Sequence, residues 1–312
     1  MGSSGRWWRC RVCNKLGVKM KRHIKNYIKT KSSLNYNYWR SIYHEYILKS
    51  NYKYIRKKTG HLRVLPNFMI VGTQKGGTTY LYKRLVQHPK VLSAEKKEIH
   101  YFDDYYNKST NWYRSHFPTK MQMKINNQYI TGEATPYYLY DKLSPKRIAS
   151  IVPNVKIIIL LRNPVKRAIS HYWYEKKSLK NEHLPLMEAL KKEEERLARG
   201  RKKKEFENRY KSFEYKHFSY KHRGLYQEQI KRYKKYFSSS QLMFIKSERM
   251  FSDNNYIQKI FGFLDLPRTY TSKKVVYKNS NNYPNVKKAE RYLKSYFQDK
   301  NTELKKIVGF DW

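Results

Sequence analysis

A strand, a glycine-rich turn and a helix follow one another in the stretch NFMIVGTQKGGTTYLYKRL (67–85), and this order restricts the fold more than any other part of the chain. The run FMIV is apolar, and Gly76 and Gly77 allow the backbone to approach a ligand closely. A helix that begins at such a turn presents unpaired N–H groups and the positive end of its dipole. The stretch therefore predicts an anion-binding loop.

The lysine of this loop stands in an unusual place. The nucleoside-triphosphate signature G-x-x-x-x-G-K-[ST] has its lysine after the last glycine, where it reaches the β- and γ-phosphates. Here Lys75 comes before Gly76 and Gly77, and Thr78 and Thr79 follow with hydroxyl groups that can donate to an anion. The loop therefore keeps the features of a phosphate site while departing from the triphosphate pattern.

Short apolar runs alternate with helical patterns from Leu65 onward. The runs YITGE (129–133), VKIIILL (155–161) and LMFIK (242–246) indicate strands. Strands that alternate with helices predict an α/β fold, P-loop-like and three-layered, in which helices flank a central parallel sheet on both faces. We expect the charged stretch from Asn181 to Lys216 to form an exposed helix and loop over the sheet. The chain is thus divided into a basic N-terminal extension (1–64) and one domain (65–312).

A second anion-binding motif follows VKIIILL, the strongest of these strand patterns. Arg162 comes at the carboxyl end of this strand, which we expect to be central, and open α/β sheets bind ligands at that end. Pro164 suits the first turn of a helix, and Ser170 lies one to two turns into it. Arg162 and Ser170 can converge on one phosphate. Two separate anion sites fit a ligand phosphorylated at two distant points better than a triphosphate.

With these motifs the chain resembles the sulfotransferases that use 3′-phosphoadenosine 5′-phosphosulfate (PAPS). In that family the loop matching TQKGGTT (73–79) holds the 5′-phosphosulfate, and the pair matching Arg162 and Ser170 holds the 3′-phosphate. The resemblance covers residues 65–312 and points to the heparan-sulfate-type (carbohydrate) enzymes and their bacterial relatives. The other matching stretches are KKEIHYFD (96–103), NWYRSHFP (111–118), GEATPYYL (132–139), SERMF (247–251) and VGFDW (308–312).

The resemblance implies catalytic roles for a lysine and a glutamate. Sulfuryl transfer builds negative charge on the oxygen that leaves with the 5′-phosphate, and Lys75 is placed to stabilise that charge without Mg²⁺. Glu98 matches the family's catalytic glutamate, the base that takes the acceptor's proton. His100 is its rival, because an imidazole titrates near neutral pH and an extended segment would point both side chains the same way. A surface ion pair between Glu98 and Lys97 or Lys96 is a third interpretation.

Three further stretches have weaker assignments. Glu133, Thr135 and Pro136 follow a strand and either line the acceptor cleft or form a strand-end turn. Tyr226, in the stretch RGLY, either faces the cofactor, as the resemblance implies, or belongs to a helix cap. The family's closing loop carries Lys-Gly-Arg between paired cysteines. The corresponding stretch YKNSNNYP (277–284) has neither, so Lys278 is the expected source of charge.

The formal net charge of +44, from 68 Lys+Arg against 24 Asp+Glu, predicts attraction to polyanions or reflects background composition. A P-loop nucleotide kinase and a non-enzymatic binder of polyanions or nucleic acid are therefore the alternatives to a sulfotransferase. The first needs the missing GK[ST], and no nucleic-acid-binding module is visible, so no nucleic acid is expected as a partner. Aromatic side chains and a basic surface favour a carbohydrate or glycolipid acceptor.

The cysteines and the apolar stretches restrict the expected metal sites and cellular location of the protein. Cys10 and Cys13 form a lone CxxC without the second pair of ligands that a zinc site needs, and no metal is expected. No run reaches the length of a membrane span, and no signal peptide is visible. We therefore expect a cytoplasmic protein, with peripheral contact to an anionic membrane through its basic N-terminal residues.

Overall fold

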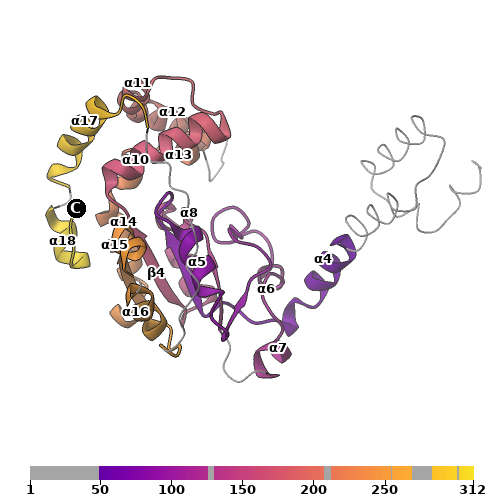
Figure 1. Cartoon of the computed structure of the whole chain (residues 1–312). Helices are drawn as coiled ribbons and strands as arrows, with labels where there is room; N and C mark the ends of the chain where they lie inside the picture. The colour runs from indigo at the N-terminus through magenta and orange to yellow at the C-terminus, as the bar shows by residue number, and fades with distance from the viewer. Residues whose placement is uncertain (1–48, 126–129, 207–211, 254, 269–282, 301) are drawn as a thin grey trace, which may run out of the picture. The chain divides into compact units, whose positions relative to one another are not determined.

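The computed structural model describes residues 49–125, 130–206, 212–253, 255–268, 283–300 and 302–312 (Figure 1). The chain divides into two compact units, Met1–Lys57 and Lys58–Trp312. In the first unit, the described part is helix α4 (Lys49–Lys58), whose last residue belongs to the second unit. The predicted features at Cys10, Cys13 and Lys278 lie outside the described residues.

A five-stranded parallel sheet forms the centre of the second unit, in the order β2-β3-β1-β4-β5. The predicted α/β fold with a central parallel sheet is thereby confirmed. Four strands coincide with the predicted runs, whereas β2 was missed because three residues are too few to show a pattern. The strands are β1 (Phe68–Gly72), β2 (Val91–Ser93), β3 (Ile130–Ala134), β4 (Lys156–Leu161) and β5 (Leu242–Lys246).

Alternate residues of the central strands enter separate cores on the two faces of the sheet. In β4, Ile157 and Ile159 belong to one core and Ile158 and Leu160 to the other. Because both sets are fully buried, the strand is apolar along nearly its whole length. The helices of the first core are α8 (Tyr137–Tyr140), α9 (Ser144–Ile151), α14 (Tyr226–Lys234) and α18 (Thr302–Val308). Those of the second are α5 (Thr78–Leu85), α15 (Ser247–Ser252) and α16 (Asn255–Phe263).

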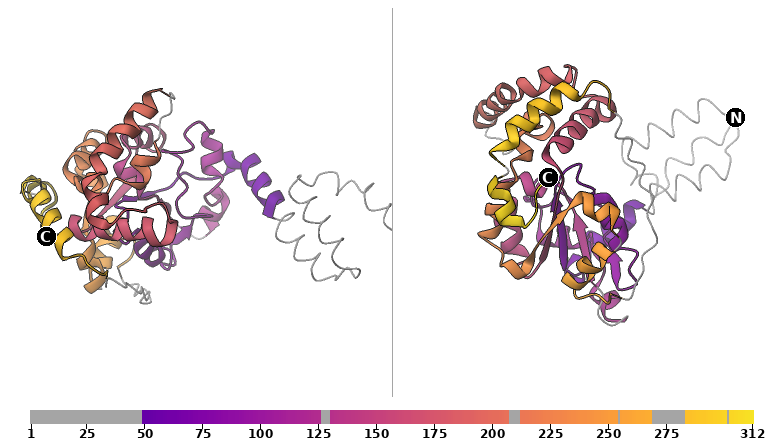
Figure 2. Two further views of the ribbon diagram at one scale, coloured as in Figure 1. Left: turned by 90° about the horizontal axis from the view of Figure 1, so that it is seen from above. Right: turned by 60° about the vertical axis from the view of Figure 1, so that its left-hand side comes forward.

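A third core lies among helices rather than on the sheet. It joins α10 (Pro164–Trp173), α11 (Leu186–Lys191) and α17 (Lys287–Gln298), and Figures 1 and 2 show these helices together. The expectation that residues 181–216 lie over the sheet was therefore wrong. The reason is that Leu186, Ala189 and Leu190 form an apolar stripe that packs against α10 and α17.

The same stretch continues as α12 (Glu193–Phe206) and α13 (Phe213–His217). It is only partly exposed, because Glu193 is buried and its carboxylate accepts the backbone N–H groups of Lys221 and His222 at 2.6 and 2.8 Å. This anchors the start of α12 to the short helix η5, which precedes α14. The shorter helices of the unit are η3 (Gly60–Leu62), α6 (Thr110–Arg114), α7 (Lys120–Ile125), the π-helix η4 (Tyr174–Leu179), η5 (His222–Gly224) and η6 (Ser239–Gln241).

The carboxyl ends of the parallel strands meet at one edge of the sheet, as they must in this topology. The glycine-rich loop follows β1, Arg162 follows β4, and Ser247 follows β5. Chain segments far apart in the sequence therefore converge there. Within the described ranges, none of the helices is both long enough and apolar enough to cross a membrane.

Candidate active site

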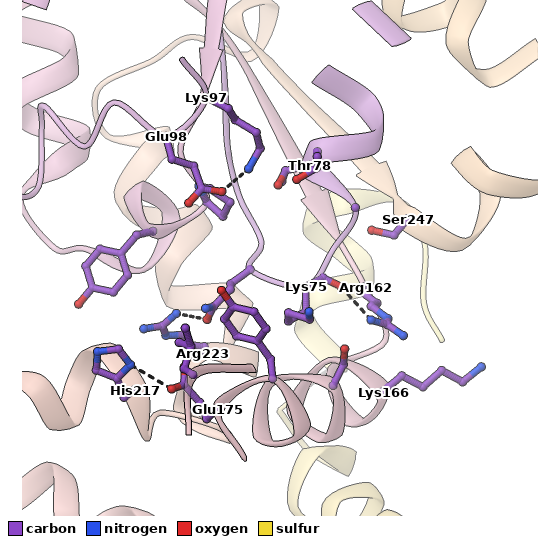
Figure 3. Close-up of a pocket in the computed structure, with 18 of the residues that line it drawn as sticks. Lys75, Thr78, Lys97, Glu98, Arg162, Lys166, Glu175, His217, Arg223 and Ser247 are labelled. Atoms are coloured by element: carbon purple, nitrogen blue, oxygen red, sulfur yellow. Dashed lines mark hydrogen bonds and ion pairs between the residues drawn. The ribbon is translucent and has the colours of Figure 1, made fainter. Parts of the chain in front are cut away.

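A cavity of about 610 Å³ opens at this edge of the sheet (Figure 3). Its wall brings together the glycine-rich loop, the segment after β4 and the KKEIHYFD segment. Two motifs separated by more than 80 residues of sequence thus face one space, as the two-site hypothesis requires. Eight of the predicted site residues line it: Lys75, Gly77, Thr78, Thr79, Glu98, His100, Arg162 and Ser170.

Backbone geometry explains the glycine pair of the loop. Gly77 caps α5 with φ +94°, in the left-handed region, and a Cβ there would lie 2.6 Å from the ring of Phe251. Gly76 is buried, and its carbonyl accepts a hydrogen bond from the Ser247 hydroxyl at 2.7 Å. The loop is thereby fixed to the segment that follows β5, and the first turn of α5 is held at the cavity wall.

Lys75 is held at the cavity wall by its neighbours. Its ammonium lies 4.4 Å from the centre of the Tyr174 ring, a cation–π contact. Burial lowers the pKa of Lys75, the neighbouring charge of Arg162 lowers it further, and the charge of Glu175 acts in the opposite direction. A partly desolvated cation between other charges interacts strongly with an incoming anion.

Arg162 and Ser170 lie on the same wall as the loop. The guanidinium of Arg162 donates to the carbonyl of Lys75 at 2.8 Å, which connects the two predicted anion sites directly. The Ser170 hydroxyl accepts a hydrogen bond from the hydroxyl of Tyr283 at 3.3 Å. Tyr283 also lines the cavity, so it extends the second site beyond the pair that the motif predicted.

The segment that carries Glu98 and His100 is not extended, so the condition under which strand alternation would point both side chains the same way is not met. Both residues have positive φ values, +61° and +59°, so the chain turns sharply at each. Their side chains nevertheless approach, because Nε2 of His100 lies 3.8 Å from a carboxylate oxygen of Glu98. Nδ1 of His100 is bonded to Asp103 at 2.7 Å, which orients the ring. A local turn rather than strand alternation therefore pairs the two candidate bases.

Electrostatics distinguishes the two candidate bases. Burial works to raise the pKa of Glu98, but hydrogen bonding with His100 and the charge of Lys97 hold it at about 2. Burial works to lower the pKa of His100, but hydrogen bonds with Asp103 and Glu98 raise it above its ordinary value. At neutral pH Glu98 is therefore ionised, as a base must be, whereas His100 stays protonated to a higher pH than an ordinary histidine. Glu98 is ion-paired with Lys97, yet both residues line the cavity, so the pair is part of the site.

The sulfotransferase domain family matches residues 65–312 of the chain, which is most of its length. The chain belongs to this family. Among solved structures, the sulfotransferase from Alicyclobacillus acidocaldarius is 26% identical with a TM-score of 0.61, over 80% of this chain and 98% of that one. The family assignment decides against the nucleotide-kinase alternative.

Two curated relatives are similar to parts of the chain. Heparan sulfate glucosamine 3-O-sulfotransferase 3A1 of Mus musculus is 32% identical over 227 residues, or 72% of this chain and 52% of that protein. The membrane-associated sulfotransferase kil1 of Dictyostelium discoideum is 40% identical over 129 residues, or 41% of this chain and 27% of that protein. The chain therefore spans about half the length of the first relative and about a quarter of the second.

Two predicted positions, Tyr226 and Glu133, are not part of the cavity wall. Tyr226 is 1% exposed and does not line the cavity; its hydroxyl donates to the carbonyl of Arg162, just after β4, at 2.8 Å. Glu133 is fully buried, accepts hydrogen bonds from Tyr113 and Thr135, and has its pKa raised by burial to about 7. Of the GEATP stretch, Pro136 reaches the cavity.

Several residues that line the cavity were not predicted from the sequence. Arg223 is buried beneath the loop and donates to the side chain of Gln74 and to the carbonyl of Lys216 at 2.7 Å. Its guanidinium also lies 4.8 Å from the ring centres of Tyr137 and Tyr140. The RGLY stretch was the only available signal, and it pointed to Tyr226 instead. Other missed lining residues are Tyr174, Glu175, Leu179, His217 and Glu248.

Proposed function

We propose that the chain transfers a sulfuryl group from PAPS to a hydroxyl or amine of a carbohydrate acceptor. The observation that carries this proposal is the single cavity that joins the loop lysine, the Arg162–Ser170 pair and the Glu98 carboxylate. Membership of the sulfotransferase family supports the reaction type. The names of relatives such as the heparan sulfate 3-O-sulfotransferases support the acceptor class.

The donor groups on the wall suit a ligand with phosphates at two ends. The first turn of α5, with Thr78, Thr79 and Lys75, would hold the 5′-phosphosulfate. Arg162 and Ser170 would hold the 3′-phosphate. Cationic and hydroxyl groups supply all of these contacts, and this set requires no metal ion as a bridge.

PAPS supplies the sulfuryl group, and 3′,5′-adenosine bisphosphate is the product left behind. Lys75 stabilises the negative charge on the departing phosphate oxygen. Glu98 accepts the proton from the attacking hydroxyl or amine, and His100, held by Asp103, adjusts the position and charge of that carboxylate. His100 itself is the second candidate for the base.

A carbohydrate or glycolipid fits the open part of the cavity. Tyr137 and Tyr174 offer aromatic faces on which a sugar ring can stack, and Lys97 and Lys216 offer cationic groups for acidic substituents. This combination favours a sugar that carries some acidic groups.

We further propose peripheral contact with an anionic membrane at its cytoplasmic face, through the basic residues 1–64. The name of the membrane-associated Dictyostelium relative agrees with such a setting. Co-sedimentation of the full chain with phosphatidylserine vesicles, compared with phosphatidylcholine vesicles, tests this. Equal sedimentation with both would contradict it.

The central test is a transfer assay with ³⁵S-labelled PAPS over desulfated heparan sulfate, desulfated chondroitin and the neutral cellohexaose. We expect label on at least one glycan with wild-type protein and almost none with Lys75→Ala. In parallel, 3′,5′-adenosine bisphosphate should bind tightly without Mg²⁺ by calorimetry. Absence of both binding and transfer would overturn the proposed function.

A further inference from the structure

A second carboxylate–imidazole pair lines the cavity, apart from Glu98 and His100. Glu175 lies in the π-helix η4, which continues the helix that carries Ser170. His217 ends α13, a helix that comes 42 residues later. A carboxylate oxygen of Glu175 lies 3.0 Å from Nδ1 of His217 (Figure 3). Because π-helical turns redirect side chains and recur at functional sites, this pairing deserves a functional explanation.

The surroundings of Glu175 hold the pair in one arrangement. The carboxylate is fully buried, and the amide of Asn181 donates to the same oxygen at 3.0 Å. Its other oxygen lies 3.3 Å from Nε2 of the buried His171. Burial works to raise the pKa of Glu175, but the contacts with His171, His217 and Asn181 hold it at about 2. The amide nitrogen of Asn181 also lies 3.0 Å from Nδ1 of His217. Because an ionised carboxylate only accepts hydrogen bonds, we assign the proton to Nδ1 of His217 and let the Asn181 amide donate to the carboxylate as well.

The opposite nitrogen of His217 remains available. In the described part of the chain Nε2 has no protein partner, and the ring is 17% exposed on the cavity wall. The neighbouring Lys216 forms an ion pair with Asp104 at 3.3 Å, and Asp104 in turn lies 3.7 Å from His100. The α13 segment is thereby tied to the loop that carries the proposed base. His217 therefore faces the space in which an acceptor would lie beside Glu98.

We propose that His217 is an acceptor-binding residue, which hydrogen-bonds a sugar hydroxyl through Nε2, and that Glu175 is the positioning residue that orients its ring. A buried carboxylate bonded to Nδ1 fixes both the tautomer and the direction of the imidazole. The inference rests on the proposed function, because it names a contact of the acceptor in that same site. It assigns no chemistry to the pair.

The test measures the KM values for acceptor and for PAPS separately, with ³⁵S-labelled PAPS and the best glycan among desulfated heparan sulfate, desulfated chondroitin and cellohexaose. His217→Ala should raise the acceptor KM about tenfold, the effect of one lost hydrogen bond. The KM for PAPS and the binding of 3′,5′-adenosine bisphosphate should stay unchanged. His183→Ala, which removes an exposed imidazole of the same region, is the control and should change nothing.

Variants of Glu175 separate positioning from simple structural support. Glu175→Ala should raise the acceptor KM as His217→Ala does, and the double variant should be no worse than either single one. Glu175→Gln keeps an acceptor oxygen of the same shape and should restore most of the affinity. An unchanged acceptor KM in His217→Ala, or an equal rise in both KM values, would overturn the inference. Failure of the proposed function looks different, since wild-type protein would then label no glycan and the inference would fall with it.

Discussion

The two halves of the cavity are built in different ways. The donor half, formed by the loop 73–79, Arg162 and Ser170, comes from segments that directly follow two adjacent central strands. The acceptor half combines a local turn, which pairs Glu98 with His100, and a contact between Glu175 and His217, which lie 42 residues apart. A site whose residues directly follow strands of the sheet is specified by the local sequence. A site whose side chains come from separate helices depends on how those helices pack in the whole fold. Changes in the helical layer should therefore affect the acceptor half more than the donor half, to which that layer contributes Ser170 on α10.

Replacement of Glu98 is expected to have the largest effect. Glu98→Gln keeps the shape of the side chain but removes the base, so kcat should fall by about 10²- to 10⁴-fold. Because Glu98 belongs to the acceptor half, binding of 3′,5′-adenosine bisphosphate should not change. Steady-state kinetics and calorimetry measure the two quantities. Glu95→Gln, an exposed glutamate outside the cavity, is the control, and a near-normal kcat in Glu98→Gln would exclude Glu98 as the base.

Removal of the Lys75 ammonium should have the second-largest effect on kcat. Lys75→Ala is expected to lower kcat by about 10²- to 10³-fold, because the leaving oxygen loses its stabilising charge. The KM for PAPS should rise less than kcat falls if the contact strengthens during the reaction. Lys83→Ala, on the exposed side of α5, serves as control. A loss confined to KM would mean that Lys75 binds the donor without assisting its chemistry.

Arg162 tests the donor half alone. Arg162→Ala should weaken binding of 3′,5′-adenosine bisphosphate by roughly 10- to 150-fold, the range for a lost charge-assisted hydrogen bond. Arg162→Lys keeps the charge but not the planar guanidinium, so its affinity for 3′,5′-adenosine bisphosphate should lie between those of wild-type protein and Arg162→Ala. The acceptor KM should remain the same. An unchanged dissociation constant would disprove the assignment of Arg162 to the 3′-phosphate.

Replacement of Tyr226 tests whether a buried hydrogen bond to the Arg162 carbonyl affects donor binding. Tyr226→Phe removes the hydrogen bond to the Arg162 carbonyl and should lower the free energy of unfolding by about 1 kcal/mol. Binding of 3′,5′-adenosine bisphosphate should weaken less than in Arg162→Ala. Tyr233→Phe, which loses a similar buried bond to the Tyr138 carbonyl on the same helix, should match it in stability only. Thermal unfolding and calorimetry check both, and identical behaviour of the two variants would remove any link between Tyr226 and the donor half.

The smallest effect is expected from pH. With Glu98 as base and its pKa held at about 2, kcat should stay flat between about pH 5 and pH 8. With His100 as base, its raised pKa would make kcat fall with decreasing pH from a point above the pH at which an ordinary histidine titrates, because the ring gains a proton. A pH–rate profile of wild-type protein therefore separates the two candidates. A clear acidic limb near neutrality would favour His100.

The donor half could be predicted because its information is contiguous. KIIILL is buried along nearly its whole length in β4, so its apolar run marks a central strand, and Arg162 follows directly. The glycine pair marks the loop because a positive φ such as the +94° of Gly77 favours glycine over other residue types. Each signal lies within a few neighbouring residues, and the strand order then brings the two together.

In the acceptor half, Glu98 and His100 were predicted, but their local geometry and the Glu175–His217 pair were not, for equally physical reasons. Positive φ values at Glu98 and His100 are unusual for residues other than glycine, and no local pattern announces them. The Glu175–His217 contact joins a π-helix to a helix end 42 residues away, and neither residue belongs to a motif. The role of Tyr226 stayed open between the cofactor and a helix cap, because its motif gives its position along the chain but not the direction in which a buried hydroxyl points.

The continuity of α10 with η4 has a kinetic consequence. Ser170 and Glu175 lie on one continuous helix. A shift of that helix when the nucleotide binds therefore also moves the part of the wall that is proposed to contact the sugar. Linkage then demands reciprocity, so that each substrate changes the affinity of its partner by the same factor. Product-inhibition patterns, which report whether the two substrates enter in a compulsory order, are where this mechanical connection would become visible.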